Sequence, residues 1–187
     1  MPKGRPSLKG RFLLDGGKLH GSLFHRTVVL VCEHDAAGAF GLVLNRPSEA
    51  KLTDVFEQEL PDAIRSATLS GGGPVQPSAL SYLHSDALKT DGDVLPDLSI
   101  GHDLGELVEL GGSWSPSRQL RVFVGYAGWS SGQLDDEMRR GAWLAHPATS
   151  ELVFRAPPEE LWHYLLRLRD RWPERLLAEA PDDLSWN

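Results

Sequence analysis

The architecture is most constrained by one segment, Val122-Phe123-Val124-Gly125-Tyr126-Ala127-Gly128-Trp129-Ser130-Ser131-Gly132-Gln133-Leu134. Its apolar start predicts a strand, its glycines predict a tightly bent loop, and we expect a helix to begin near Gln133. Glycine lets the backbone approach a partner closely, and such loops often carry binding or catalytic residues. The segment has no nucleophile–base pair, no metal-ligand spacing and no phosphate-loop pattern. It therefore marks a candidate binding surface without fixing a reaction.

Two apolar segments earlier in the chain predict a hairpin. Thr27–Cys32 is a continuous run of mostly β-branched residues, which is typical of a strand buried on both faces. Phe40–Leu44 follows a short glycine-containing turn, so the two segments are expected to pair antiparallel. Pro47 should end the second strand, because it favours an extended Arg46 and donates no backbone hydrogen bond.

The remaining pattern predicts a mixture of strands and helices. We expect strands at 80–84, 120–126, 143–145 and 152–154, a surface loop at 85–100, and helices over 52–60, 133–140 and 159–172. Residues 103–110 suit either a strand or a helix. Leu161, Leu165, Leu168 and Trp172 share one apolar stripe of the last helix.

Strands and helices do not alternate regularly, and the sequence contains no repeat and no linker. This order favours an α+β fold with a mixed or antiparallel sheet over a doubly wound parallel sheet. A length of 187 residues fits one domain with its own core. We therefore expect a single domain over residues 1–187, with residues 1–9 as a flexible arm.

Composition indicates an ordinary globular protein of a reducing compartment. Hydrophobic residues make up 41% and charged residues 24%. No apolar run approaches the ~20 residues of a membrane span, so no membrane association is expected. Met1–Pro6 is basic but lacks the apolar core of a secretory signal, and the single cysteine excludes an internal disulfide. We expect a cytoplasmic protein.

The charge balance argues against non-specific binding of nucleic acid. The net charge is −7 and the isoelectric point is near 5.5, whereas DNA-binding proteins usually present clustered lysine and arginine. The one basic cluster is interleaved with acidic residues and is typical of a solvated helix face. It consists of Arg167, Arg169, Arg171 and Arg175, with Asp170 and Glu174 between them.

Two further segments suggest chemistry at first sight. Cys32-Glu33-His34-Asp35 pairs a thiol with a possible base, but a cysteine at the end of an apolar strand is usually a small buried hydrophobe. Gly71-Gly72-Gly73-Pro74-Val75-Gln76 is better explained as a rigid turn than as a phosphate loop, because its prolines remove donors. The seven histidines show no metal-ligand spacing, so neither a metal nor a cofactor is expected.

Several motifs occur together in an order that resembles the YqgE/AlgH family of bacterial proteins, from about Gly10 to the end of the chain. They are Phe24-His25-Arg26-Thr27-Val28, Glu33-His34, Gly41-Leu42-Val43-Leu44-Asn45-Arg46-Pro47, Gly72-Gly73-Pro74-Val75-Gln76, Gly125-Tyr126-Ala127-Gly128-Trp129, Gly132-Gln133-Leu134, Glu137, Trp143 and Pro147. The resemblance implies a compact α+β domain with a bifurcated, partly barrel-like sheet flanked by helices. It implies no established activity. One branch is named for an association with the regulation of alginate synthesis, which gives the family its label of transcriptional regulator.

We expect a binding or regulatory module that uses the Gly125–Gln133 loop and the Asn45–Pro47 turn, with a protein or small molecule as partner. The candidate residues are Asn45, Arg46, Gln76, Tyr126, Trp129 and Gln133. Polar, uncharged residues on such loops orient a ligand more readily than they transfer protons. Trp129 itself suits a buried anchor better than a ligand-stacking surface.

Two alternatives stay open. A regulator that contacts DNA requires a contiguous basic face, built for instance from Arg139, Arg140, Arg167 and Arg171. A hydrolase or transferase requires Cys32, His34 or His84 to converge with an acidic residue in one pocket. Of the two broad classes, a protein without enzymatic activity is favoured over an enzyme.

Overall fold

A computed structural model describes residues 6–57, 59–86, 91–169 and 171–180. The strands in these residues form one nine-stranded sheet, in the order β4-β5-β8-β3-β2-β1-β9, with β6 between β7 and β8. They are β1 Arg11–Asp15, β2 Val28–Asp35, β3 Gly38–Val43, β4 Pro47–Lys51, β5 Thr68–Gly71, β6 Val75–Asp86, β7 Leu98–Gly101, β8 Arg118–Ser130 and β9 Trp143–Pro147.

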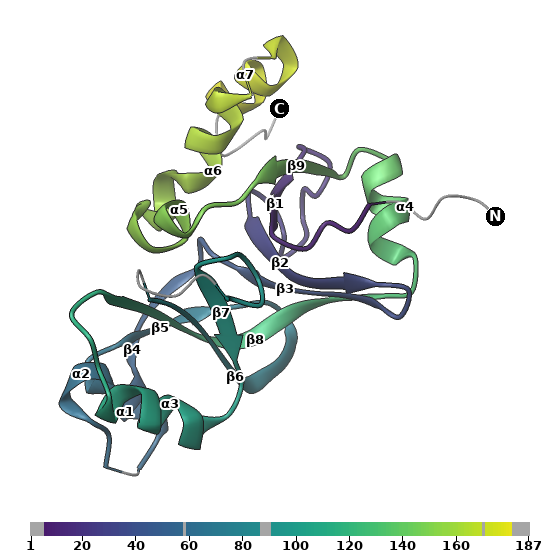
Figure 1. The fold of residues 1–187 in the computed structure, drawn as a ribbon. Coiled ribbons are helices and arrows are strands. Elements are labelled where there is room, and N and C mark those ends of the chain that lie inside the picture. Colours follow the sequence, from purple (N-terminus) through teal and green to yellow (C-terminus); the bar gives the residue numbers. More distant parts are fainter. Residues whose placement is uncertain (1–5, 58, 87–90, 170, 181–187) are drawn as a thin grey trace.

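Helices cover the sheet in three groups (Figure 1). The helices α1 Leu52–Val55, α2 Asp62–Arg65 and α3 Leu104–Gly112 pack at one end, near β4 to β6. At the other end, α4 Gln133–Arg139 lies on one side of β1 and β9, and α5 Ser150–Arg155, α6 Pro158–Leu168 and α7 Trp172–Glu179 lie on the other. The α+β fold with a mixed, mostly antiparallel and bifurcated sheet flanked by helices is thereby confirmed.

The long strand β8 joins the two parts of the sheet. Its first half pairs with β5 in parallel and with β6 antiparallel, so that Val122 faces both Leu69 and Tyr82. Its last residues pair antiparallel with β3, with Ala127 opposite Gly41. Gly125 has a φ of 70° where the strand changes partners, a conformation that glycine adopts without strain.

The loop expected after Val124 is therefore wrong. The strand continues through Ser130, because Gly38–Gly41 of β3 pairs with residues 127–130. A Cβ on Gly38 would lie only 2.2 Å from the Trp129 carbonyl oxygen, so this glycine permits close strand contact rather than a bend. The helix expected from Gln133 is confirmed.

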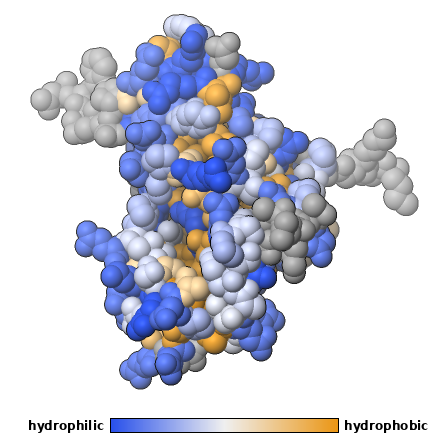
Figure 2. All heavy atoms as spheres, turned by 60° about the vertical axis from the view of Figure 1, so that its left-hand side comes forward, coloured by the Kyte–Doolittle hydropathy of each residue, from blue (hydrophilic) through white to orange (hydrophobic). Residues whose placement is uncertain are grey.

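Three apolar clusters fill the fold. The first lies between the sheet and α5 to α7 and contains Leu30 and Trp162. The second contains Val29 and Trp129 on the opposite face, and the third packs Ile64 against the other end of the sheet. Consecutive residues of β2 thus enter different clusters, which confirms a strand buried on both faces. The face brought forward in Figure 2 shows an interrupted apolar seam between hydrophilic margins.

Other local expectations differ from the structure. The helix predicted over 52–60 ends at Val55, because Phe56 takes an extended conformation and packs against the third cluster. Residues 152–154 belong to helix α5, whose first turn Thr149 caps, and not to a strand. Residues 104–110 form most of α3, and Asp103 caps its start. The predicted loop over 85–100 contains the start of β7, and residues 87–90 lie outside the described residues.

The helix predicted over 159–172 is two helices. The first ends at Leu168, and Trp172 begins α7 with its side chain 74% exposed, so it does not continue the buried stripe. Arg169 lies between them, with its Nε 3.5 Å from Glu174 Oε1. Pro173 favours a new helix start at this point, because its missing N–H is not needed in a first turn.

Part of the expected N-terminal arm contacts the fold. Ser7 donates its hydroxyl to the His34 carbonyl, the Leu8 N–H donates to His34 Nδ1, and Leu8 packs against the second cluster. Residues 1–5 of that arm lie outside the described residues. None of the helices in the described ranges is both long and apolar enough to cross a membrane.

Candidate functional site

Trp129 and Tyr126 lie on opposite faces of the sheet. Their positions in β8 differ by an odd number of residues, so their side chains alternate. Tyr126 packs against Phe40, with ring centroids 4.9 Å apart, on the side of the first cluster. Trp129 is 6% exposed within the second cluster. The two aromatic residues of the Gly125–Gln133 segment therefore do not share one surface.

Trp129 is held by a polar network from helix α4. Its indole N–H donates to Glu137 Oε2 at 2.9 Å, and the Trp143 indole donates to the same oxygen at 2.7 Å. The other oxygen, Oε1, accepts from Gln133 Nε2 at 3.0 Å. Gln133 Oε1 in turn accepts from the N–H and the hydroxyl of Ser130. Gln133 thus links the end of β8 to its own helix.

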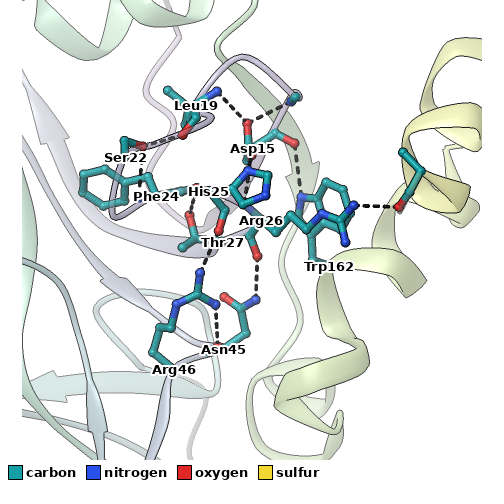
Figure 3. Close-up of polar contacts among 12 residues, drawn as sticks. Asp15, Leu19, Ser22, Phe24, His25, Arg26, Thr27, Asn45, Arg46 and Trp162 are labelled. Atoms are coloured by element: carbon teal, nitrogen blue, oxygen red, sulfur yellow. Dashed lines mark hydrogen bonds and ion pairs between the residues drawn. The ribbon is translucent and has the colours of Figure 1, made fainter. Parts of the chain in front are cut away.

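Asn45 is buried and links the end of β3 to the residues at the start of β2; its contact with Arg26 is drawn in Figure 3. Its Oδ1 accepts from the Val28 N–H and its Nδ2 donates to the Arg26 carbonyl, both at 2.8 Å. Arg26 has a φ of 52°, which is unusual for a residue with a side chain. The Arg26 N–H donates to Asp15 Oδ2 at 2.8 Å. Asn45 and Asp15 together fix this backbone from both sides.

Asp15 is fully buried and serves as the acceptor for a whole loop. Besides Arg26, its carboxylate accepts from the N–H groups of Gly17 at 2.8 Å and Leu19 at 3.3 Å. His25 Nδ1 lies 3.4 Å from Asp15 Oδ2. Burial and the neighbouring His20 lower the pKa of His25, and Asp15 opposes that shift without cancelling it.

Arg46 emerges from the same network toward solvent. Its Nη1 donates to its neighbour's carbonyl, Asn45 O, at 3.0 Å, and its Nη2 donates to the His25 carbonyl at 2.6 Å. Burial lowers its pKa. No carboxylate within the described ranges pairs with it, so the fixed guanidinium keeps N–H groups for another acceptor.

A mostly apolar pocket of about 220 Å³ opens beside Arg46. It lies between the segment before β2, the end of β3 and the glycine-rich turn after β5. Its lining comprises Leu23, Phe24, Val43, Arg46, Gly71, Gly73 and Pro74. Leu23 is 74% exposed at its rim, and Phe24 stacks on Trp129 with centroids 6.5 Å apart. The Asn45–Pro47 turn and the Gly71–Gln76 turn meet at this pocket, whereas the Gly125–Gln133 segment contributes no lining residue.

The six candidate residues do not all lie at this pocket. Arg46 lines it, Asn45 lies directly behind Arg46, and Trp129 supports Phe24 from below. Gln76 is exposed two residues beyond Pro74, with a φ of 43° and, in the described part of the chain, no side-chain hydrogen bond. Tyr126 and Gln133 make their contacts elsewhere.

Sequence reasoning missed the apolar half of the pocket. Leu23 and Phe24 precede a strand by only a few residues, and nothing local distinguishes them from core residues. The exposure of Leu23 is known only from the structure, whereas Phe24 opens one of the motifs quoted above, and that is the signal in the sequence. Asp15 holds the backbone of the site and stands in none of the motifs quoted above. Glu137 is one of the motif residues, but the motif does not indicate that it accepts from two tryptophans.

The residues required for covalent chemistry do not converge. Cys32 is fully buried, its Sγ faces the Leu30 carbonyl oxygen, and burial raises the pKa of its thiol. His34 accepts from the Leu8 N–H, whereas His84 lies beside the Tyr82 ring. The described residues contain no group of three side chains suited to hold a metal ion.

The arginines named for a DNA-binding face lie on separate helices. Arg139 is on α4 and pairs with Asp136, three residues earlier. Arg167 and Arg171 belong to α6 and the start of α7, on the other side of β1 and β9 from α4 (Figure 1). Arg169 of the same cluster turns inward and donates to the Ala145 carbonyl.

Comparison with known proteins places this architecture in a group of bacterial proteins. A family model described as AlgH-like matches residues 12–171. UPF0301 proteins from Chlorobium chlorochromatii and Chlamydia muridarum are 35% and 34% identical and cover 92% and 96% of this chain, at 92% and 95% of their own length.

Two solved structures share the fold. The solution structure of the AlgH protein from Pseudomonas aeruginosa has a TM-score of 0.73 at 30% identity and covers 98% of this chain and 100% of its own. A crystal structure of a protein from Corynebacterium diphtheriae has a TM-score of 0.72 at 24% identity, covering 95% and 94% of the two chains.

Proposed function

The chain belongs to the AlgH-like family, and from this premise we propose that it is a binding module whose partner occupies the pocket beside Arg46. The Asn45–Pro47 turn supplies the guanidinium, and the Gly125–Gln133 segment supports the pocket through Trp129. Binding at this pocket serves a regulatory role in the cytoplasm, and no turnover of the partner is involved.

One observation carries the proposal: a rigidly held guanidinium without a carboxylate partner in the described part of the chain stands at the edge of an apolar pocket. Two backbone carbonyls fix Arg46, so little side-chain entropy remains to be lost on binding. An arginine beside an apolar anchor site is a common composition of interface hot spots.

The pocket size favours a protein partner. Small-molecule sites usually measure about 300–1,000 Å³, and this pocket of about 220 Å³ is smaller. It suits one inserted side chain better than a cofactor. The fitting partner presents an apolar side chain next to a carboxylate or carbonyl oxygen, so that the chain fills the space by Phe24 and the oxygen accepts from Arg46. A small carboxylic acid with an apolar group is the alternative occupant.

Affinity capture from a native cell lysate tests this proposal, with proteins, nucleic acids and metabolites identified in the bound fraction. We compare the wild type with Arg46→Ala and Leu23→Ala, after confirming by circular dichroism that each is folded. Both variants should retain at least about tenfold less of the partner, since hot-spot truncations cost about 2 kcal/mol or more.

Matched controls remove similar side chains elsewhere. Arg65→Ala deletes an exposed arginine that pairs with Asp62, and Val55→Ala shortens a half-exposed apolar residue on α1. Equal losses in control and pocket variants, or equal capture by all proteins, contradict the proposed site. Capture of DNA with a steep salt dependence would instead favour the DNA-contacting regulator.

A further inference from the structure

A second arginine, Arg121 of β8, lies near the Asn45–Pro47 turn and donates to the Leu44 carbonyl just before it. It lines a separate pocket of about 350 Å³ between β5, β8 and the α5–α6 connection. Pro47 and Phe154 form apolar parts of the wall, and Ser66, Thr68 and Ser70 contribute hydroxyl groups. The residues of this pocket include neither aspartate nor glutamate.

Neutral acceptors hold the Arg121 guanidinium in place. Its Nη1 donates to the Val153 carbonyl at 2.9 Å and its Nη2 to the Leu44 carbonyl at 2.7 Å, with Ser70 Oγ at 3.5 Å. The guanidinium carbon lies 5.2 Å from the centroid of the Phe123 ring. A guanidinium has five N–H groups, so these contacts leave donors unused.

The charge of Arg121 is not neutralised within residues 6–57, 59–86, 91–169 and 171–180. No carboxylate forms an ion pair with it there. Burial alone lowers its pKa to about 10, so it remains cationic at neutral pH. Burying a cation without an accompanying opposite charge costs roughly several kcal/mol. The folded protein therefore carries an unfavourable electrostatic free energy at Arg121, which a bound anion would offset.

Two neighbouring pockets that contain an arginine differ from the Arg121 pocket because they also contain carboxylates. Two pockets around α5 also contain an arginine, Arg155, but both include Glu151. Glu160 adds a second carboxylate to one of them and Asp97 to the other. An anion entering either pocket meets like charge, whereas an anion beside Arg121 meets hydroxyl groups and an unpaired guanidinium.

We infer that the Arg121 pocket binds a small organic molecule that carries an oxyanion, either a phosphate or a carboxylate group. The oxyanion accepts from the free N–H groups of Arg121 and from the hydroxyls of Ser70 and Thr68. The pocket volume lies in the range of small-molecule sites and exceeds what one phosphate fills. The organic body packs on Pro47 and Phe154. This site is independent of the partner pocket beside Arg46.

Titration of the full chain, followed by backbone NMR, tests the inference with inorganic phosphate, phenyl phosphate, benzoate and the neutral analogue benzamide. We expect saturable shifts at Ser66–Ser70 and at Leu120–Arg121 with phenyl phosphate or benzoate, and at least about tenfold weaker binding of benzamide. Preference for phenyl phosphate over benzoate, or the reverse, identifies the class of oxyanion.

Variants separate a specific site from general attraction. Arg121→Gln should weaken binding of the preferred anion at least about tenfold, while Arg139→Gln makes the same charge change at an exposed α4 residue and should leave binding unchanged.

Because Arg121→Gln removes two bonds to buried carbonyls and can impair folding, Thr68→Val and Ser70→Ala provide a second test and should each weaken binding several-fold. Equal binding by benzamide, the absence of saturable shifts, or unchanged binding in both hydroxyl variants overturns the inference. Shifts confined to Gly71–Pro74 would place the anion beside Arg46 instead and likewise overturn it.

Discussion

Trp129 and Trp143 donate their indole N–H groups to the same carboxylate oxygen, Oε2 of Glu137, at 2.9 and 2.7 Å. One residue of α4 thereby ties the end of β8 to β9 across the second apolar cluster. The two rings meet edge to face, 6.1 Å apart, and Phe24 packs against both. The apolar wall of the pocket beside Arg46 therefore depends on a carboxylate that does not touch the pocket.

Replacement of Glu137 should destabilise the whole domain. Glu137→Ala leaves two indole donors without their acceptor, and an unsatisfied buried donor costs about 1–3 kcal/mol. We expect a loss of ~3 kcal/mol in the free energy of unfolding, measured by urea denaturation. Asp136→Ala, an exposed residue of the same helix, serves as the control. A loss for Glu137→Ala no larger than the control's contradicts the structural role of the carboxylate.

Asp15 makes a comparable contribution to the loop before β2. Its carboxylate accepts from three backbone N–H groups, and Asp15→Asn replaces one accepting oxygen by a donor that faces the same N–H groups. We expect a loss of ~2–3 kcal/mol in unfolding free energy. Asp35→Asn changes an exposed carboxylate that accepts from the Ala37 N–H and should cost under about 1 kcal/mol. Similar losses in both variants would show that burial of Asp15 does not matter.

The local sequence pattern predicts those elements that form mainly through contacts between residues close together in the chain. The β2–β3 hairpin follows from an apolar run and a short turn, and the start of α4 follows from acidic residues after glycine. The course of Gly125–Ser130 did not follow, because pairing with β3 involves residues about ninety positions away. Glycines in a sequence predict a bend, whereas Gly38 and Gly73 permit backbones to touch.

Because contacts between distant residues are not visible in a local pattern, the sequence predicts only some of the residues around the pocket beside Arg46. Arg46 and the turn that ends at Gln76 were marked by their own residue types. Leu23 and Phe24 join them only because Asp15 folds the preceding loop back across β3. Trp129 and Tyr126 lie on opposite faces because side chains alternate along a strand, and a loop over these residues would not predict that alternation.

The free energy of unfolding should decrease as the pH falls below about 6.5, and His25 should account for part of that decrease. Its pKa in the folded state is lowered from 6.5, chiefly by burial, so the unfolded chain binds more protons between the folded value and 6.5. Unfolding free energy therefore rises with pH in that window, and the contribution is lost as pH falls below about 6.5. Denaturation of the wild type and His25→Gln across this range measures it. The variant should show a shallower dependence, and parallel curves would refute the assignment.

Gln76→Gly should make the protein more stable. Gln76 adopts a φ of 43° and its side chain is exposed. That side chain forms no hydrogen bond within the described residues, so no polar side-chain contact there offsets the cost of this conformation. Glycine adopts a positive φ freely, although it also increases the entropy of the unfolded chain. Since a non-glycine residue in this region costs of order 1 kcal/mol, we expect a net gain of ~0.5 kcal/mol in unfolding free energy.

The same variant separates a structural from a functional role for this glutamine. Residues with strained backbones cluster at functional sites, and Gln76 stands next to the turn that lines the partner pocket. If Gln76 contacts the partner, Gln76→Gly unfolds at higher urea concentration yet captures less partner than the wild type. Gln76→Ala, which keeps the strain and removes the amide, should lose the same capture without the gain in stability. Full capture by both variants would show that the amide plays no part in binding.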